Sequence, residues 1–521
     1  MRTAVYNRYW DTGGGAEKYG AVVAQILSGD GPLDMLSHDA VDVDWLADRL
    51  HVELSKVDVR TINDDAGAIT EAAREYDLFV NVSYMSSDPA PDLRSLYVVH
   101  FPAPLDEQFG AVQQALARAF PRLRRSLDVS MRWGQGFYHR EVGIGGVAWT
   151  NGDARLRFIT KPGSPLTVRL VFGHLRPRDA GPTPVRIEVD GEVRSELTLA
   201  PPRSRLEGHR SVVAQVEVES PEPGVPVEVR IVSDTFVPSE VLGTGDRRCL
   251  GVPLKRLDLG SHRTASMARW LPLPVGASAS ADWTESYGAI VANSEFTRAW
   301  VDRYWGCDSE VVHPPVTMYA PRTKEPTILA VGRFFPADMG HSKKQLELVR
   351  AFRALVDQGV RGWTLHLVGG CSDAGQGYLA EVRRVAEGYP VRIHVDATGP
   401  QLEALYGAAS IYWHASGLGE DAQRHPGRLE HFGITTVEAM SAGAVPVVIG
   451  LAGQLETVRH GVDGFHFRTL GGLVALTRQL VDDERARQRM SSSAITRARA
   501  FDLDAFEGRL RAVVDRVVGD T

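Results

Sequence analysis

The sequence predicts an α/β protein with two doubly wound domains and an antiparallel β-rich domain inserted into the first of them. Near both ends of the chain, short apolar runs alternate with segments of helical spacing, as in TAVYN followed by AEKYGAVVAQIL. Each parallel crossover needs a helix to return the chain, so this alternation indicates a parallel sheet in each domain. Between Leu156 and Leu259, period-two runs separated by Pro and Gly turns predict an antiparallel sandwich or barrel.

These changes of pattern set the predicted domain boundaries. The first α/β domain takes residues 1–150 and resumes at 260–318, where GAIVANSEFTRAWV is a strand followed by a helix capped at Ser294. The sandwich-like insertion takes 151–259, and the second α/β domain takes 319–500. We expect residues 501–521 to form a helix that returns to the first domain. A chain of 521 residues is too long for one core.

Composition excludes several classes of protein. A net charge of -7 argues against a nucleic-acid partner. The three cysteines, Cys249, Cys307 and Cys371, lack metal-ligand spacing and are read as reduced thiols in a cytoplasmic protein. No apolar signal core follows the N-terminus, and the longest apolar run is far shorter than the roughly 20 residues that span a bilayer.

One basic, partly apolar stretch, ARAFPRLRRSLDVSMRW, leaves room for a peripheral membrane contact at the inner face. Its arginines could rest on an anionic surface that carries a lipid-linked substrate. The alternative is a solvated helix that packs the insertion onto the first domain. The arginines are Arg118, Arg122, Arg124, Arg125 and Arg132.

The strongest chemical signal is EHFGITTVEAMSAG, where Glu430 and Glu438 stand eight positions apart around Gly433. We expect a helix to begin near Gly433, and a helix N-terminus offers N–H groups and a partial positive charge to a diphosphate. Glu438, about one turn inside, could accept two vicinal hydroxyls such as those of a ribose. The alternative is a helix whose acids merely complement its dipole.

Upstream, GRFFPADMGHSKKQ places Arg333 and a lysine pair at the mouth of the same sheet. Two cations there could neutralise charge on a departing diphosphate, Arg333 by bidentate contact and Lys344 as a mobile point charge. Lys343 competes with Lys344 for this role. The alternative is a solvated helix face.

Near the N-terminus, DTGGG lies between the first strand and the first helix. Glycine lets backbone approach a phosphate without an intervening side chain, although a simple tight turn explains the run equally well. His100, in VVHFPAP, ends a strand and could point into a cleft or serve as a hydrogen-bonded structural residue.

The ordered set GRFF…KKQ…AF, YWHASG, EHFGITTVEAMSAGAVPVVI and ETVRHGVDGF, from about Ile328 to Phe467, resembles the family 4 retaining glycosyltransferases. These enzymes have the GT-B fold, with two Rossmann-like domains. The histidine and phenylalanine after the first glutamate resemble the mannosyltransferase-like branch. The resemblance implies that Glu438 holds the nucleotide ribose and Glu430 a donor-sugar hydroxyl. It implies a catalytic His100 in the cleft and a donor site made of Gly14, Gly15, Arg333, Lys344, Phe432, Gly433, Ile434, Thr435 and Glu438.

The implied activity is retaining transfer of a sugar from a nucleotide diphosphate sugar to a glycan, lipid-linked or small-molecule acceptor. GDP-mannose is the first donor expected, followed by UDP-sugars, with no metal and no cofactor besides the donor. Glu456 is left out of the site because the paired glycines that often precede the family's later glutamate are missing. Asp42-Val43-Asp44 is discounted as a metal-binding DxD motif because it lies in a variable polar stretch.

Other functions remain open at this point because one fold can serve several activities. A sugar-nucleotide epimerase or a phosphorylase could use the same double-domain plan. A non-catalytic carbohydrate-binding or scaffold protein could also retain the fold.

Overall fold

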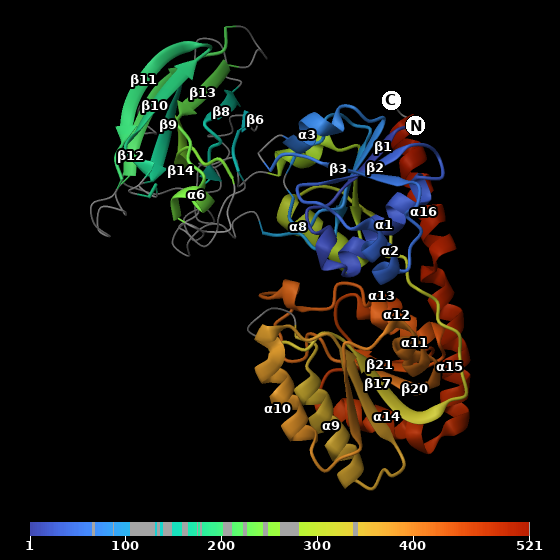
Figure 1. Cartoon of the computed structure of the whole chain (residues 1–521). Coiled ribbons are helices and arrows are strands. Elements are labelled where there is room, and N and C mark those ends of the chain that lie inside the picture. The colour runs from blue at the N-terminus through green and yellow to red at the C-terminus, as the bar shows by residue number, and fades with distance from the viewer. Residues whose placement is uncertain are drawn as a thin grey trace.

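A computed structural model describes residues 1–64, 68–86, 88–104, 131–132, 136–138, 148–158, 165–173, 176–177, 180–201, 211–221, 227–242, 248–260, 281–336 and 342–519. Figure 1 shows two α/β lobes, one above the other, with a β-rich unit to the side of the N-terminal lobe. The α/β fold class with an antiparallel insertion is therefore confirmed.

The N-terminal lobe is built on a seven-stranded parallel sheet in the order β16-β15-β5-β4-β1-β2-β3. Several of these strands are buried along their whole length, as expected where helices cover both faces. The strands are β1 (Thr3–Tyr6), β2 (Leu33–Ser37), β3 (Val57–Thr61), β4 (Leu78–Asn81), β5 (Ser95–Val99), β15 (Ala289–Ala292) and β16 (Glu310–Val311). The helices are η1 (Trp10–Thr12), α1 (Gly15–Leu27), α2 (Val43–Leu50), α3 (Ala68–Ala73), η6 (Asp282–Ser286) and α8 (Glu295–Trp305).

The insertion leaves this sheet after β5 and returns at β15. These two strands are nevertheless neighbours, with Leu96 opposite Ala289. The insertion is a sandwich of a five-stranded sheet, β11-β10-β13-β8-β6, and a four-stranded sheet, β12-β9-β14-β7. Its elements are β6 (Met131–Arg132), β7 (Ala148–Trp149), β8 (Asp153–Phe158), β9 (Leu166–Gly173), β10 (Thr183–Val189), β11 (Glu192–Leu199), β12 (Ser211–Val218), β13 (Val227–Ser233), α6 (Pro238–Leu242) and β14 (Pro253–Gly260).

The start of the insertion differs from the predicted boundary at residue 151. Strand β6 pairs with β8, and β7 pairs with β14, so the β-rich unit already includes residues 131–132 and 148–149. A strand of two residues carries no alternation of apolar and polar positions. The sequence pattern therefore could not mark where this unit begins.

The C-terminal lobe has a six-stranded parallel sheet in the order β19-β18-β17-β20-β21-β22. This is the 3-2-1-4-5-6 order of Rossmann folds, in which ligands bind beyond the carboxyl ends of the strands. The strands are β17 (Glu325–Val331), β18 (Thr364–Gly369), β19 (Val391–Val395), β20 (Ala409–His414), β21 (Val445–Ile449) and β22 (Phe465–Phe467). The helices are α9 (Gln345–Asp357), η8 (Asp373–Gly375), α10 (Gln376–Ala386), α11 (Gly399–Ala408), η9 (Pro426–Arg428), α12 (Ile434–Ser441), α13 (Gln454–Thr457), α14 (Leu470–Asp482), α15 (Glu484–Ala498) and η10 (Arg499–Phe501).

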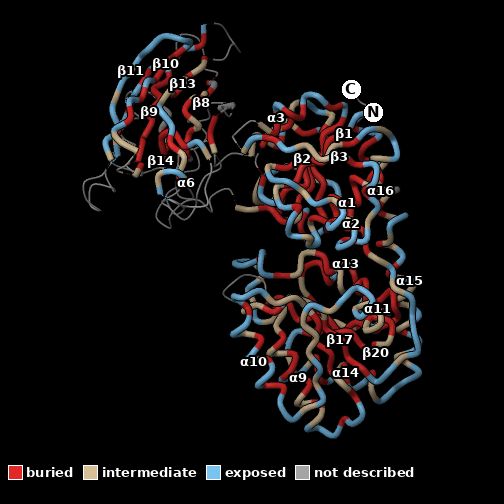
Figure 2. Tube along the Cα trace, viewed as in Figure 1, coloured by how far each residue is buried: buried red, intermediate tan, exposed pale blue. Residues whose placement is uncertain are grey.

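The last helix, α16 (Leu503–Gly519), belongs to the core of the N-terminal lobe. Its apolar face, with Phe506, Leu510 and Val513, packs in one cluster with Val5 of β1 and Tyr19 of α1. Figure 2 shows the buried residues concentrated in the sheets of both lobes, and Figure 1 shows α16 reaching the upper lobe. Within the described ranges, no helix combines the length and apolar composition that a membrane span requires.

Candidate functional site

Helix α12 starts at the carboxyl edge of the C-terminal sheet, where β20 ends. Its N-cap, Gly433, has a φ of 105°, a conformation that side chains disfavour. A Cβ there would lie 2.6 Å from Nε2 of Gln454, which in turn donates a hydrogen bond to Thr436. Thr435 is fixed separately, because Tyr412 donates to its hydroxyl over 2.8 Å. The first turn of α12 is thus held in one position.

Glu438 lies in the second turn of α12 and is only 8% exposed. Tyr406 of α11 donates a hydrogen bond to one carboxylate oxygen over 2.8 Å. Burial raises the pKa of Glu438, while the positive charge of Lys18 opposes that shift. Lys18 comes from α1 of the other lobe and donates to Thr317. This buried carboxylate therefore has polar neighbours from both lobes.

Glu430 precedes α12 in the loop that leaves β20. One of its oxygens, Oε2, lies 2.5 Å from Nζ of Lys343 and 2.9 Å from Nε2 of His414. Burial lowers the pKa of His414 although the carboxylate favours its charged form. A neutral His414 that donates to Glu430 carries its proton on Nε2. Glu430 is therefore held by one cation and one hydrogen-bond donor.

The two adjacent lysines point to different carboxylates. The stem of Lys343 lies over Gly332, where a Cβ would come within 2.5 Å of its Cγ, and its ammonium reaches Glu430. Lys344, the N-cap of α9, has a φ of 58°, and its ammonium lies 2.8 Å from Glu420. Lys343, the competing choice in the sequence, is thus the lysine beside Glu430. Lys344 instead holds Glu420, which lies in the loop that precedes Glu430.

Arg333 follows β17 and is exposed. Its guanidinium lies 5.9 Å from the centre of the Phe335 ring. Among the described residues, no Asp or Glu forms an ion pair with Arg333. The backbone beside it is fixed because Gln345 donates to the carbonyl groups of both Gly332 and Arg333. The loop thus presents a cation at the same edge of the sheet as Glu430.

The glycine turn of the N-terminal lobe lies against α12. A Cβ on Gly15 would come 3.2 Å from Cδ1 of Ile434, the first residue of that helix. The backbone N–H of Gly14 donates to the buried carboxylate of Glu17 over 2.9 Å. Two helix N-termini, those of α1 and α12, therefore approach each other across the interface between the lobes.

His100 is held by the N-terminal lobe itself. Its Nε2 donates to the carbonyl oxygen of Val82 over 3.0 Å, and its ring packs edge-on against Tyr19. Burial lowers its pKa, which favours the neutral ring. These contacts match the hydrogen-bonded structural role that the sequence left open.

Several residues near this site were not predicted as part of it, among them Lys18, Tyr406, His414 and Glu420. Tyr406 precedes Glu438 by 32 positions, and only the packing of α11 on α12 brings them together. Lys18 reaches the site across the lobe interface. His414 did leave a signal, because a histidine at the carboxyl end of a buried strand lies where ligands bind in such sheets.

The discounted DxD sequence has a structural role at a helix start. Asp42 caps α2 by accepting a hydrogen bond from the N–H of Trp45 over 2.9 Å. Within the parts of the chain that are described, no group of three or more His, Cys, Asp or Glu residues could hold a metal ion.

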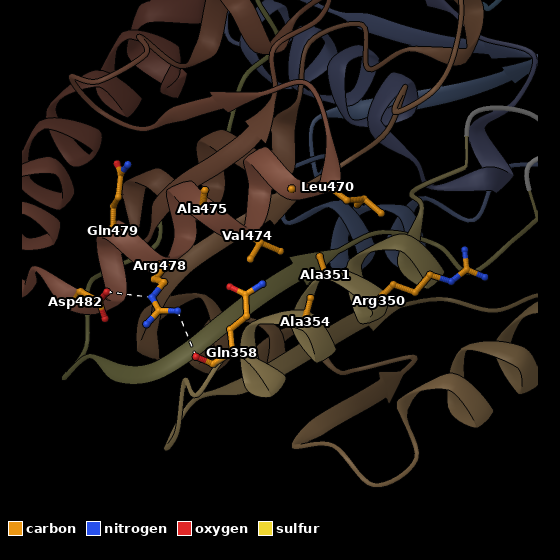
Figure 3. A pocket seen from close by; sticks show the side chains of 11 residues that line it. Arg350, Ala351, Ala354, Gln358, Leu470, Val474, Ala475, Arg478, Gln479 and Asp482 are labelled. Atoms are coloured by element: carbon orange, nitrogen blue, oxygen red, sulfur yellow. Dashed lines mark hydrogen bonds and ion pairs between the residues drawn. The ribbon is translucent and has the colours of Figure 1, made fainter.

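A pocket lies between α9 and α14, at the end of α9 remote from Lys344, and Figure 3 shows the residues that line it. Its volume is about 670 Å³. There Arg478 donates to the carbonyl of Gln358 and pairs with Asp482.

The basic stretch considered for membrane contact is mostly outside the described residues. This holds for Arg118, Arg122, Arg124 and Arg125, and for the side chain of Arg132.

Comparison with solved structures identifies the fold. Anabaena HepE in complex with UDP is 13% identical, with a TM-score of 0.52, covering 99% of this chain and 100% of that chain. The same protein with UDP-glucose is 13% identical, with a TM-score of 0.50 and 99% of each chain covered. A glycosyltransferase from Rickettsia africae is 11% identical, with a TM-score of 0.53, covering 100% of this chain and 99% of that chain. At these identities the likeness concerns architecture alone, and that architecture is GT-B.

A search among curated proteins finds no match. A match to a family model does exist, and it covers the lobe that carries Arg333, Lys343, Glu430 and Glu438. Residues 319–497, which span the C-terminal lobe, match the model described as glycosyl transferases group 1.

Proposed function

We propose that the protein is a retaining glycosyltransferase that takes a sugar from a nucleotide diphosphate sugar, with the donor bound at the start of α12. One observation carries the proposal. Glu430 and Glu438 lie on either side of the α12 N-terminus, each fixed by its own donors, and the glycine turn of the other lobe faces that N-terminus.

In this proposal Glu438 accepts hydrogen bonds from the ribose, and Glu430 accepts one from a hydroxyl of the donor sugar. The diphosphate lies against the backbone of Phe432, Gly433, Ile434 and Thr435, where the helix dipole favours negative charge. Arg333 and Lys343 supply the cations. Lys343 replaces Lys344 in this role because Lys343 is the lysine beside Glu430.

The step breaks the bond between the anomeric carbon and the diphosphate oxygen. A hydroxyl oxygen of the acceptor forms the new bond on the same face of the sugar, and its proton passes to the departing diphosphate. Charge grows on the diphosphate as it leaves, so preorganised cations and N–H groups favour the transition state more than the ground state. These groups supply positive charge without a metal ion, and we propose metal-independent transfer on that basis.

The acceptor is a glycan, a lipid-linked sugar or a small molecule bound by the N-terminal lobe and its insertion. UDP-sugars and GDP-mannose are the first donors to test, the former because HepE was solved with UDP-glucose. Contact with a membrane surface stays a prediction from the basic stretch.

The experiment is a screen of UDP- and GDP-sugars that detects released nucleotide and records the anomeric configuration of the product by NMR. Transfer with retention supports the proposal, and inversion contradicts it. Binding of a nucleotide without any turnover would favour a carbohydrate-binding or scaffold protein. Release of an isomerised sugar nucleotide would favour an epimerase. The same assay in excess EDTA should retain full activity, whereas rescue only by magnesium or manganese would contradict metal independence.

Two glutamate variants test the site. Glu438→Ala should weaken nucleotide binding by about 10- to 150-fold, equivalent to losing a charged hydrogen bond worth roughly 1.5–3 kcal/mol. Glu430→Ala should leave nucleotide affinity within about twofold and lower turnover, because it contacts the sugar. If both variants keep the parental constants in titration calorimetry and kinetics, the donor site lies elsewhere.

A further inference from the structure

Glu456 lies in the C-terminal lobe, but its carboxylate caps a helix of the N-terminal lobe. One oxygen accepts the N–H of Glu295 and the other accepts the N–H of Phe296, each over 2.8 Å. These are the first two residues of α8. The next N–H, that of Thr297, is taken by Ser294 within the lobe itself. The α8 N-terminus therefore draws two of its hydrogen-bond acceptors from the other lobe.

A carboxylate at a helix N-terminus is favoured by both hydrogen bonding and the helix dipole. Here the carboxylate is partly shielded from water, because the Glu456 side chain is only 16% exposed. His313, in the segment between the lobes, adds a third contact, with Nε2 3.2 Å from the same carboxylate. Contacts of this kind between lobes resist separation of the lobes.

The short helix that carries Glu456 is also locked to the loop of Glu430. The N–H of Gly453 donates to the carbonyl of Glu430 over 3.0 Å. A Cβ on Gly453 would lie 2.3 Å from the His431 carbonyl oxygen and 2.4 Å from Cα of Phe432. The two backbones are therefore in direct contact, which couples the position of α13 to that of this loop.

The same loop touches the N-terminal lobe directly. The His431 ring stacks on Phe101, with centroids 4.1 Å apart and planes 10° apart. The His431 ring also stacks near the ring of Phe296, with ring centroids 6.2 Å apart. The backbone N–H of Phe296 is the one bound by Glu456. Residues after β5 and at the start of α8 thus meet the loop that leads into the donor site.

We propose that Glu456 is a positioning residue that couples closure of the two lobes to the placement of the Glu430 loop. This inference rests on the proposed function for its effect on turnover. With the lobes closed, the α8 N-terminus holds Glu456, α13 holds the loop, and Glu430 stays beside Lys343. With the carboxylate removed, the lobes open more readily, and the stacking of His431 on Phe101 across the lobe interface weakens.

The test compares four proteins: the parent, Glu456→Ala, Glu295→Pro and Glu295→Ala. Glu295→Pro removes one N–H bound by Glu456 but should keep α8, because proline is favoured at the first position of a helix and Ser294 has the extended backbone that precedes proline. Glu295→Ala is the matched control. It removes a carboxylate from the same turn, one that pairs only with Arg298 among the described residues, and keeps the N–H.

Small-angle X-ray scattering of each protein, with and without UDP or GDP, reports the separation of the lobes independently of any activity. We expect a larger radius of gyration for Glu456→Ala and an intermediate one for Glu295→Pro, with Glu295→Ala equal to the parent. Nucleotide affinity should stay within about twofold of the parent, because the ribose and diphosphate contacts lie on α12. Turnover should fall about tenfold or more in Glu456→Ala, as expected for losing a charge-assisted hydrogen bond.

Unchanged scattering in Glu456→Ala, in a protein that keeps the parental circular dichroism, overturns the inference. So does a Glu295→Ala variant as open as Glu456→Ala, because the carboxylate of Glu456 would then not be the determinant. If Glu456→Ala fails to fold, Glu295→Pro decides alone. A parent without transferase activity would contradict the proposed function and leave the scattering comparison intact as a test of the lobe contact.

Discussion

The two α/β lobes share their sheet architecture and differ at the edge where ligands bind. In both, the strands run in the order expected of a Rossmann-like sheet. The C-terminal edge carries two ion pairs, one between Lys343 and Glu430 and one between Lys344 and Glu420. The facing N-terminal edge presents a glycine turn and a histidine tied into its own lobe. Two sheets of the same architecture can therefore present different chemical groups, because those groups lie on the loops. Here the C-terminal loops present charged side chains, and the N-terminal loops present a glycine turn and a histidine.

The largest expected effect tests the charges of the C-terminal edge. Lys343→Ala should lower kcat by about 100-fold or more, in line with the loss of one group that stabilises transition-state charge. Lys344→Ala should cost less than about tenfold, because Lys344 supports the loop through Glu420. Steady-state kinetics with the active sugar nucleotide measures both. A larger loss of kcat in Lys344→Ala than in Lys343→Ala would show that Lys344 is the diphosphate ligand, as the sequence predicted.

The second test asks whether the start of α12 is as rigid as its contacts indicate. Gly433→Ala places a Cβ 2.6 Å from Gln454 in a backbone with positive φ, whereas Gly461→Ala meets the same kind of backbone with open space around it. Both variants carry the strain of positive φ, and Gly433→Ala should lose about 1–3 kcal/mol more from overpacking. Urea denaturation gives the two free energies of unfolding. Equal losses would mean that Gln454 moves aside at little cost.

The third test concerns pH and the C-terminal sheet. Burial lowers the pKa of His366 on β18 to about 4, and the neighbouring charges of His394 and Arg392 act in the same direction. The unfolded chain takes up this proton near pH 6.5, before the folded protein does, so stability should fall as pH drops from 7 towards 5. His366→Asn should remove on the order of 1 kcal/mol of that dependence. Thermal melts at several pH values measure it, and parallel curves for parent and variant would refute it.

The smallest effect on nucleotide binding is expected from removing the insertion, which belongs to the N-terminal lobe. A protein in which residues 105–280 are replaced by a Gly/Ser linker keeps the C-terminal edge intact, so its nucleotide affinity should change by less than about twofold. Transfer to the native acceptor should be lost. Normal transfer by this protein would remove the insertion from acceptor binding and leave oligomerisation or another partner as its role.

Sequence reasoning was strongest where one element carries the signal. Gly433 and Glu438 lie one turn apart on α12, so their spacing alone placed them at a helix start, and the structure has α12 beginning at Ile434. The alternating runs likewise predicted the sandwich, because alternation along a strand is a local property. The start of the insertion was missed because β6 and β7 are too short to alternate.

Contacts between elements could not be predicted from spacing. Lys343 and Lys344 are adjacent in sequence, yet their ammonium groups pair with different carboxylates, those of Glu430 and Glu420. Glu456 was set aside for lack of a glycine pair, yet Gly453 alone provides the close approach to His431 and Phe432. Such contacts depend on how lobes and helices pack against each other. That packing produces no periodic pattern of apolar residues in the sequence.

Helix α16 has a consequence for how the protein is made. Phe506, Leu510 and Val513 complete a core whose first members include Val5 and Tyr19. The N-terminal strands are synthesised first, but the apolar face of α16 that covers them is synthesised only after the C-terminal lobe. The C-terminal lobe, continuous from β17 to α15, has its whole core available earlier. We therefore expect the lobe encoded second to become protease-resistant first in a pulse-chase experiment, while the lobe encoded first waits for α16.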